Sequence, residues 1–491
     1  MTGDTDFYSR LGVERGASEE DIRKAYRAAA RRLHPDVNVE EGATEIFLNI
    51  KDAYEVLIDP HKRAAYDENK PAPPPPPIRL NTVFSREAIN CINDPQLIYV
   101  LIELDVFVDI PENEDTELPI NLTLVLDNST SMKGDRLDQL KATTIELIRQ
   151  LRSQDVISIV FFNDRADVIL PAGPRPTVHK LETKVRMIDA QGGTELYQGL
   201  KTGFHEARRF LSPNYANHLI LITDGHTYGD ESECFALADQ AKNVGLTISA
   251  LGLGSEWNDE FLDKLTQRTG GSSTFVTNVS DIEFLLKEKL KGLGKAFVER
   301  VSLNFRLIPG VKLNYAFRLN PELGPLPVSP PIQLGGIPYK SRQRILLEFL
   351  VDPVQPKISR LVLAEGHFAF DIPRNNLTNY RLPITLMRPI AMDKQVEPPP
   401  RSIVEAMSKL TLYRMQEDVR ENVAIGEFDA AAQSLQNIAT HLLSQGETEL
   451  AKTAMLEVQN VRNQQKISQD GEKQIKYGTR ALLLENDFEE R

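Results

Sequence analysis

The spacing of hydrophobic positions changes several times along the chain, and each change predicts a different kind of structure. In residues 18–33 and 43–58, apolar side chains recur every three or four positions, as on one face of an amphipathic helix. Residues 78–110 and 296–388 contain β-rich runs separated by turn residues and therefore predict strands. Residues 119–290 alternate short apolar runs with segments of helical period, a pattern typical of a mostly parallel α/β sheet.

The C-terminal segment, residues 402–484, is rich in Leu, Ala, Glu and Gln and predicts a helical hairpin or small bundle. Gly426 and Gly446 are the expected stops between its helices. Each glycine is followed by a Glu residue, and the segments after the two Gly-Glu pairs resemble each other. Two copies are too few to establish a solenoid repeat. Polar residues interrupt its apolar positions, which favours packing against a core or a partner over insertion into a membrane.

Two proline clusters, at residues 73–77 and 398–400, separate these regions, and the first favours a stiff polyproline II spacer. A chain of 491 residues is too long for one core of ordinary size. We expect these divisions: residues 1–70, a linker at 71–77, strands at 78–117 and 296–388, an α/β domain at 118–295, a linker at 389–401 and helices at 402–491. The strands on either side of the α/β domain otherwise lack partners, so we expect one β-sandwich into which that domain is inserted.

Charge and cysteine content exclude some classes of function. A net charge of −13 argues against broad binding to the phosphates of a nucleic acid. No stretch has the length and apolar character needed to span a bilayer, and the N-terminus lacks an export signal, so we expect a cytoplasmic protein. Cys91 and Cys234 are isolated and far apart, which excludes a disulfide framework and a thiolate zinc site.

The N-terminal segment carries a basic helix face beside an exposed tripeptide. Ser18, with Asp21 three positions later, favours the start of a helix. Basic side chains follow along that helix: Arg23, Lys24, Arg27 and Arg31. Charges with this spacing most often form only a solvated face. A proline disfavours helical geometry in the residue before it, so His34-Pro35-Asp36 should lie in a loop between two antiparallel helices.

In the order and spacing of its motifs, this segment resembles the J-domain family. The resemblance rests on five blocks: residues 6–13 (DFYSRLGV), 22–27 (IRKAYR), 34–36 (HPD), 53–57 (AYEVL) and 62–67 (KRAAYD). It implies that His34, Pro35 and Asp36 trigger the ATPase of a DnaK-type chaperone. It also implies that Arg23, Lys24, Arg27 and Arg31 steer the helix to an acidic surface of that chaperone. The chain has no Gly/Phe-rich segment and no paired Cys-x-x-Cys region, which argues against independent holding of unfolded chains.

Polar residues with oxygen atoms follow two apolar strands of the α/β segment. The strand at 120–126 leads into a loop at 127–134 and then a helix at 135–150, and Asp224 follows a strand at 218–222. A further polar loop contains Gly192-Gly193-Thr194. Open α/β sheets gather ligands at the carboxyl ends of their strands. Hydroxyl and carboxylate oxygens without His or Cys predict a site for a hard cation such as Mg²⁺.

These residues resemble the metal-ion-dependent adhesion site of von Willebrand factor A (vWA) domains, whose pattern is Asp-x-Ser-x-Ser, a distant Thr and a distant Asp. The chain matches this pattern at five positions: Asp127, Ser129, Ser131, Thr194 and Asp224. The resemblance implies that the three hydroxyls bind the ion and that the carboxylates bind it directly or through water. An acidic side chain of a protein partner would supply the remaining ligand. Taken singly, Asp127 and Ser129 also suit a helix cap, and Asp224-Gly225 suits a turn.

Together these patterns predict a multidomain α/β protein with an all-α J domain, a doubly wound vWA domain inserted in a β-sandwich, and C-terminal helices. The leading hypothesis is an adaptor, not an enzyme, that binds a protein partner through Mg²⁺ or another hard divalent cation and recruits a DnaK-type ATPase. A vWA scaffold with a vestigial J domain is the first alternative. A magnesium-dependent hydrolase is the second, but the sequence lacks a phosphate-binding Gly-x-x-x-x-Gly-Lys-Ser/Thr loop and a suitably placed nucleophile.

Overall fold

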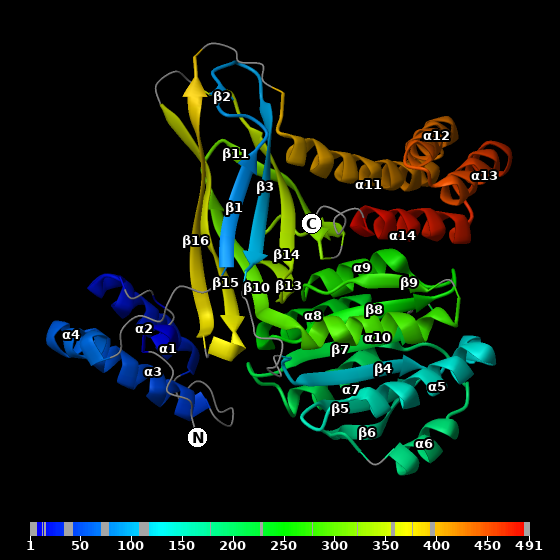
Figure 1. The fold of residues 1–491 in the computed structure, drawn as a ribbon, viewed down its shortest axis with the longest axis horizontal. Coiled ribbons are helices and arrows are strands. Elements are labelled where there is room, and N and C mark those ends of the chain that lie inside the picture. Colours follow the sequence, from blue (N-terminus) through cyan, green and yellow to red (C-terminus); the bar gives the residue numbers. More distant parts are fainter. Residues whose placement is uncertain are drawn as a thin grey trace.

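The computed structural model describes most of the chain: residues 7–11, 13, 16–33, 43–69, 78–107, 117–176, 178–225, 229–276, 278–321, 323–354, 359–375, 377–392 and 398–485. Two sheets form a tall sandwich (Figure 1). The N-terminal helices lie beside its lower end, an α/β domain lies below it, and the C-terminal helices lie to one side. This arrangement confirms the predicted fold class.

The N-terminal body consists of four described helices: α1 (Phe7–Leu11), α2 (Glu19–Leu33), α3 (Ala43–Leu57) and α4 (Pro60–Asn69). The start of α2 has the predicted reciprocal cap, because Asp21 N–H donates to Ser18 Oγ and Ser18 N–H donates to Asp21 Oδ2, both at 3.2 Å. Helices α2 and α3 pack through the stacked rings of Tyr26 and Tyr54, whose centroids are 4.1 Å apart. Ile22 is fully buried beside them.

The α/β domain contains a six-stranded sheet with the order β6-β5-β4-β7-β8-β9. Its strands are β4 (Ile120–Asp127), β5 (Val156–Phe162), β6 (Ala166–Pro174), β7 (Ala216–Thr223), β8 (Thr247–Leu253) and β9 (Ser273–Val276). Neighbouring strands are parallel, except that β5 and β6 are antiparallel. The carboxyl ends of β4 and β7 therefore lie next to each other at one edge of the sheet.

Helices cover both faces of this sheet, which makes the domain doubly wound. One face packs against α5 (Asp135–Gln150), α6 (Val178–Arg186) and α10 (Asp281–Gly294), and the other against α7 (Leu196–Arg208), α8 (Glu231–Val244) and α9 (Asp259–Gln267). Successive strand residues point to opposite faces, so Leu124 joins the first hydrophobic cluster and Val125 joins the second. A strand buried on both faces explains the continuous apolar run in the sequence.

The sandwich consists of two five-stranded sheets, with the orders β1-β3-β14-β11-β12 and β13-β10-β15-β16-β2. Its strands are β1 (Ile78–Phe84), β2 (Ile89–Asn90), β3 (Gln96–Val106), β10 (Ala296–Leu307), β11 (Val311–Asn320), β12 (Gly324–Leu326), β13 (Ile332–Pro338), β14 (Arg342–Val351), β15 (Arg360–Ile372) and β16 (Leu377–Ala391). Strand β3 pairs antiparallel with β14, from Gln96 opposite Val351 to Asp105 opposite Arg342. Segments before and after the α/β domain therefore share one sheet.

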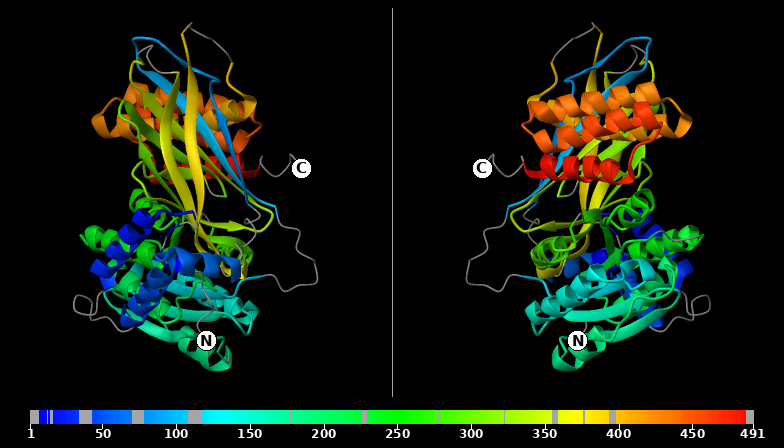
Figure 2. Two further views of the ribbon diagram at one scale, coloured as in Figure 1. Left: turned by 90° about the vertical axis from the view of Figure 1, so that its left-hand side faces the viewer. Right: turned by 90° about the vertical axis from the view of Figure 1, so that its right-hand side faces the viewer.

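The C-terminal region consists of four described helices: α11 (Arg401–Ile425), α12 (Phe428–Ser444), α13 (Thr448–Gln464) and α14 (Gln469–Glu485). Gly426 and Gly446 end successive helices with the same φ of 86°, a left-handed conformation that glycine adopts without a steric penalty. The helices lie against one face of the sandwich (Figure 2), where Ile403 and Leu410 share a hydrophobic cluster with Phe317. None of the described helices is both long and apolar enough to cross a membrane.

Helix α14 also packs on the α/β domain, through a buried group of charges. Asp263 of α9 lies 2.8 Å from Lys476 Nζ and 2.9 Å from Arg480 Nη2. Lys476 and Arg420 contact Asp259 at 2.5 and 2.9 Å. Burial raises the pKa of Asp263, but the charges of Arg480 and Lys476 outweigh burial and hold that pKa well below its usual value. We call these five residues the α14 charge cluster.

Two further contacts hold the α/β domain in place. Tyr477 of α14 lies between Trp257 and Phe275, with ring centroids 5.7 and 5.8 Å away. From the sandwich, the buried Arg318 donates to the carbonyl oxygens of Gly270 and Gly271, each at 3.0 Å. The inserted domain is thus attached both to the sandwich and to the C-terminal helices.

Candidate functional site

The structure brings the five residues of the adhesion-site pattern to one edge of the α/β sheet. Asp127 is the last residue of β4, and Asp224 directly follows the neighbouring strand β7. Ser129 and Ser131 lie in the turn that leads from β4 into α5, which includes the short 3₁₀ helix η1 (Thr130–Met132). Thr194 precedes α7. We call Asp127, Ser129, Ser131, Thr194 and Asp224 the candidate metal centre.

Hydrogen bonds connect four of these residues. Ser129 N–H donates to Asp127 Oδ1 at 2.7 Å. The Oγ atoms of Ser129 and Ser131 are 3.0 Å apart, and Ser131 Oγ donates to Asp224 Oδ1 at 2.6 Å. The second oxygen of Asp127 accepts from Thr223 Oγ1 at 2.6 Å. The loop is therefore fixed in one conformation with its oxygen atoms gathered.

Thr194 reaches the same place because two loops contact each other closely. The N–H and Oγ1 of Thr130 donate to the carbonyl oxygen of Gly192 at 3.1 and 2.9 Å. Gly225, the residue after Asp224, packs directly on Thr194: a Cβ at position 225 would lie only 2.8 Å from Thr194 Oγ1. Any larger residue at position 225 would therefore push the side chain of Thr194 away.

The donor set fits a hard divalent cation. Asp127 and Asp224 are almost completely buried, with 0% and 1% of their surface exposed. Burial raises the pKa of Asp127 to about 6, although hydrogen bonds from Ser129 and Thr223 lower it. Buried carboxylates that lack full neutralisation are stabilised by a cation, and carboxylate and hydroxyl oxygens are the ligands that Mg²⁺ and Ca²⁺ prefer. Within the described part of the chain, no group of three or more His, Cys, Asp or Glu side chains could hold a metal ion.

Sequence reasoning missed one residue of this site, Arg136. It lies in the first turn of α5, and its Nη1 atom is 2.5 Å from Asp224 Oδ2. The two oxygens of Asp224 thus have different partners, Ser131 and Arg136. The available signal was a basic side chain shortly after the Asp-x-Ser-x-Ser segment, but its partner lies 88 positions away in the sequence.

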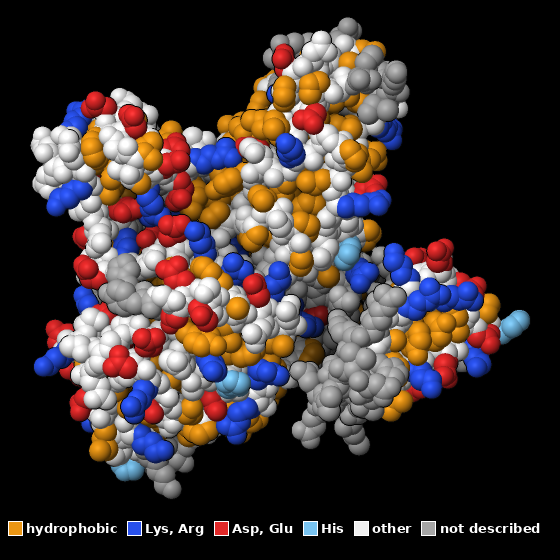
Figure 3. Space-filling view, turned by 180° about the vertical axis from the view of Figure 1, so that it is seen from behind, with side chains coloured by type: hydrophobic (Ala, Val, Ile, Leu, Met, Phe, Trp, Pro, Cys, Tyr) orange, Lys and Arg blue, Asp and Glu red, His pale blue; other side chains and the backbone are white. Residues whose placement is uncertain are grey.

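The predicted chaperone-binding residues are only partly described. Arg23, Lys24 and Arg27 are exposed on α2, where Arg23 forms an ion pair with Glu19. Figure 3 shows a row of Lys and Arg side chains over the N-terminal helices, beside an apolar patch. The side chain of Arg31 and the tripeptide His34-Pro35-Asp36 lie outside the described residues.

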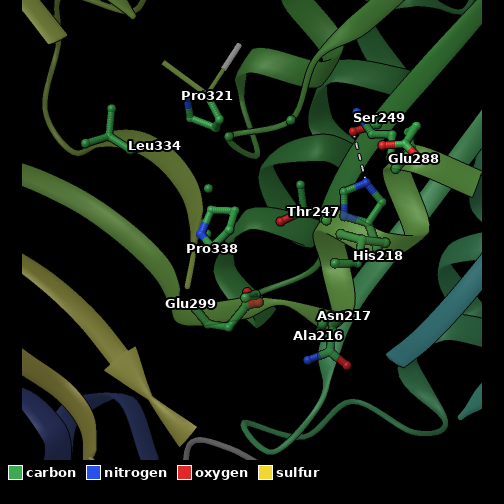
Figure 4. A pocket seen from close by; sticks show the side chains of 18 of the residues that line it. Ala216, Asn217, His218, Thr247, Ser249, Glu288, Glu299, Pro321, Leu334 and Pro338 are labelled. Carbon is green, nitrogen blue, oxygen red and sulfur yellow. Dashed lines mark hydrogen bonds between the residues drawn. The ribbon is translucent and has the colours of Figure 1, made fainter. Parts of the chain in front are cut away.

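A separate cavity of about 360 Å³ lies between the sandwich and the opposite edge of the α/β sheet (Figure 4). In it, His218 Nε2 and Ser249 Oγ are 2.9 Å apart. Glu299 faces the same space, and burial together with the charge of Asp371 raises its pKa to about 8. Because His218 and Thr247 belong to the amino-terminal halves of β7 and β8, this cavity is distinct from the candidate metal centre.

Three parts of the chain match models of known families. Residues 6–67 match the DnaJ domain, residues 121–290 match the von Willebrand factor type A domain, and residues 401–485 match the Sll0103-like C-terminal alpha-helical domain. The chain therefore contains a DnaJ domain followed by a vWA domain. A DnaJ domain implies a DnaK-type (Hsp70) partner, and both kinds of domain are typically interaction modules.

Relatives extend these matches to different extents. The chain is 26% identical over 341 residues to the uncharacterized protein sll0103 of Synechocystis. That alignment covers 67% of this chain and 80% of sll0103. The chain is 52% identical over 64 residues to the chaperone protein DnaJ of Lactococcus lactis strain IL1403. That match covers 13% of this chain and only 17% of the chaperone.

Solved structures support the same fold. A von Willebrand factor type A protein from Catenulispora acidiphila aligns with a TM-score of 0.63 at 15% identity, covering 82% of this chain and 96% of the other. The ArnB paralog VWA2 from Sulfolobus acidocaldarius aligns with a TM-score of 0.54 at 14% identity, covering 82% and 98%. At these identities the likeness concerns the fold alone.

Proposed function

We propose that this chain is a co-chaperone adaptor that binds a protein partner through a metal-dependent vWA domain and delivers a DnaK-type ATPase to it. The observation that carries this proposal is the gathering of two buried carboxylates and three hydroxyl-bearing side chains at one sheet edge, in a chain that also contains a DnaJ domain. The expected divisions, from the J domain at 1–70 to the helices at 402–491, remain part of the proposal.

At the metal centre, Ser129, Ser131 and Thr194 would bind Mg²⁺ or another hard divalent cation through their hydroxyls. Asp127 and Asp224 would neutralise its charge, directly or through water. The cation would supply a coordination position for a carboxylate of the partner protein, as hard cations favour oxygen ligands. The protein's contribution is to hold the loop in shape through the bonds from Ser129 N–H and Thr223 Oγ1 to Asp127.

At the N-terminus, His34, Pro35 and Asp36 would stimulate ATP hydrolysis by the chaperone, and Arg23, Lys24, Arg27 and Arg31 would guide its approach electrostatically. The chain would carry out no reaction itself. Because its proposed chaperone partner is of the DnaK type, we propose the cytoplasm as its location. The exposed positions of Arg23, Lys24 and Arg27 support this role.

Two measurements on the full chain test the proposal. ATP hydrolysis by a DnaK-type chaperone should accelerate with the wild-type chain and not with His34→Gln; equal stimulation by both would disprove the co-chaperone role. Mn²⁺ or Mg²⁺ binding, followed by calorimetry, should be lost in both Asp127→Ala and Asp224→Ala. Unchanged binding in these variants would disprove the metal centre.

A further inference from the structure

We propose that Arg136 is an internal counter-cation of the metal centre, which occupies Asp224 in the metal-free protein and thereby limits the affinity for divalent cations. This inference rests on the proposed metal-binding function and adds to it a residue that sets the affinity. The geometry that carries it is the direct contact between Arg136 Nη1 and Asp224 Oδ2, 2.5 Å apart.

The contact occupies Asp224 Oδ2, an oxygen that the proposed metal centre would use to bind the cation. The side chain of Asp224 is 0% exposed, and that of Arg136 is 35% exposed. Because Ser131 Oγ donates to the other oxygen of Asp224, both oxygens are already occupied by protein groups. A buried carboxylate without a partner is strongly destabilising, so Arg136 lets the metal-free loop remain folded.

The position of Arg136 in α5 is not explained by the stability of that helix. It lies in the first turn, where the helix dipole favours acidic residues such as Asp135 and Asp138 and disfavours a cation. The guanidinium is instead accommodated by Gly254, at which a Cβ would lie 2.9 Å from Arg136 Nη2. The side chain thus lies between Asp224 and a backbone that leaves room for it.

The electrostatic consequence follows from the charges. With both aspartates ionised, the centre carries two negative charges, and Arg136 reduces that surplus to one. A divalent cation that enters must either displace the guanidinium from Asp224 or bind beside a fixed positive charge, and both weaken binding. Removing only the charge of Arg136 should therefore tighten the binding of a divalent cation by about tenfold or more.

The test compares Mn²⁺ binding to the full chain by electron paramagnetic resonance or calorimetry. Arg136→Met should lower the dissociation constant by about tenfold or more, and Arg136→Lys, which retains the charge, should stay near the wild-type value. Arg149→Met is the matched control, because Arg149 lies on the same helix and pairs with Glu146 and Glu182 away from the site. It should leave the dissociation constant within about twofold.

The outcomes are distinguishable. If the wild type binds Mn²⁺ and Arg136→Met binds equally or more weakly, this inference is overturned and the proposed metal centre stands. Tight binding by Arg136→Lys as well would also overturn it, because charge would not be the cause. If neither the wild type nor any variant binds Mn²⁺, the proposed function fails and the inference fails with it. Thermal unfolding in chelator checks folding: Arg136→Met should unfold at a lower temperature than wild type, and Mn²⁺ should restore it.

Discussion

The α/β domain contains two pairs of aspartates with little solvent exposure that are neutralised to very different extents. In the α14 charge cluster, Asp259 and Asp263 face three cations, from Arg420, Lys476 and Arg480. At the candidate metal centre, the only Lys or Arg ion pair within the described residues is that between Arg136 and Asp224. The pKa of Asp263 is accordingly lowered, whereas burial raises that of Asp127 to about 6.

This difference separates a structural ion cluster from a ligand site. Buried carboxylates alone do not identify a metal centre, because Asp263 is buried too and, like the partly buried Asp259, is neutralised by protein side chains. What distinguishes Asp127 and Asp224 is the shortage of positive charge around them: one described cation, Arg136, against three at the α14 charge cluster. Four predictions test the distinction, in order of decreasing effect.

The largest effect should come from removing a cation of the α14 charge cluster. Arg480→Met leaves Asp263 buried with Lys476 as its remaining close cation, which should cost about 3 kcal/mol of unfolding free energy. Trp257 is the single tryptophan of the sequence and lies beside Tyr477, so its fluorescence during urea unfolding reports on this interface. Lys264→Met, an exposed cation on α9, is the control and should change stability by less than about 0.5 kcal/mol. Equal losses in both variants would contradict the comparison.

The second prediction concerns stabilisation by metal. Mg²⁺ at about 100 times its dissociation constant should stabilise the wild type by about 2.7 kcal/mol. Asp127→Asn should abolish that increment. Asp263→Asn should retain it even though the protein is less stable overall, because its carboxylate serves the interface with α14. Thermal unfolding with and without Mg²⁺ measures both increments, and loss of the increment in Asp263→Asn would show that the two pairs are not independent.

The third prediction is that Asp127 and Asp263 make unfolding free energy depend on pH in opposite directions, in chelator. Because the pKa of Asp127 is raised in the folded state, that state holds a proton that the unfolded state has lost. Stability therefore falls by on the order of 2 kcal/mol as the pH rises from about 4 to about 6. The folded pKa of Asp263 is lowered, so its contribution is complete above about pH 4 and is lost as the pH falls further. Unfolding free energies measured across pH test this. Asp127→Asn should remove only the change between about pH 4 and pH 6, and Asp263→Asn should remove only the loss below about pH 4.

The smallest effect should come from a single hydrogen bond at the metal centre. Thr223→Val removes the donor to Asp127 Oδ2 and should cost about 1 kcal/mol. Thr143→Val is the matched control, because the buried Thr143 Oγ1 has no hydrogen-bond partner among the described residues, and its replacement should be neutral or slightly stabilising. Urea unfolding of both variants provides the comparison; a larger loss in Thr143→Val would contradict it.

The parts of the fold that depend on local spacing could be predicted from the sequence. The helix at 135–150 and its buried residues Leu137, Leu140 and Ile148 follow from helical period, and they are found as expected. The five metal-centre positions could be named because the sequence resembles the vWA adhesion-site pattern. That Asp127 and Asp224 lie together follows from the neighbouring parallel strands β4 and β7, whose carboxyl ends share an edge. The sandwich could be inferred from strands without partners, but not its register.

The remaining features depend on contacts between distant parts of the chain. Arg136 meets Asp224 across 88 positions, and Arg480 meets Asp263 across 217. In the sequence each is only one more basic residue on a helix, where charges usually indicate a solvated face. Nothing in their local pattern distinguishes them from exposed residues such as Arg149, which pairs with Glu146 of its own helix and with Glu182 of α6.

Because 217 positions separate Asp263 from Arg480, the ribosome synthesises the two residues at different times. At ordinary rates of protein synthesis, α14 is made roughly ten to forty seconds after α9. During that interval the ribosome-bound chain has an α/β domain whose Asp263, Trp257 and Phe275 still lack the helix that covers them. The N-terminal J domain is already complete by then, so under the proposed function the growing chain itself would be the first within reach of a recruited DnaK-type chaperone.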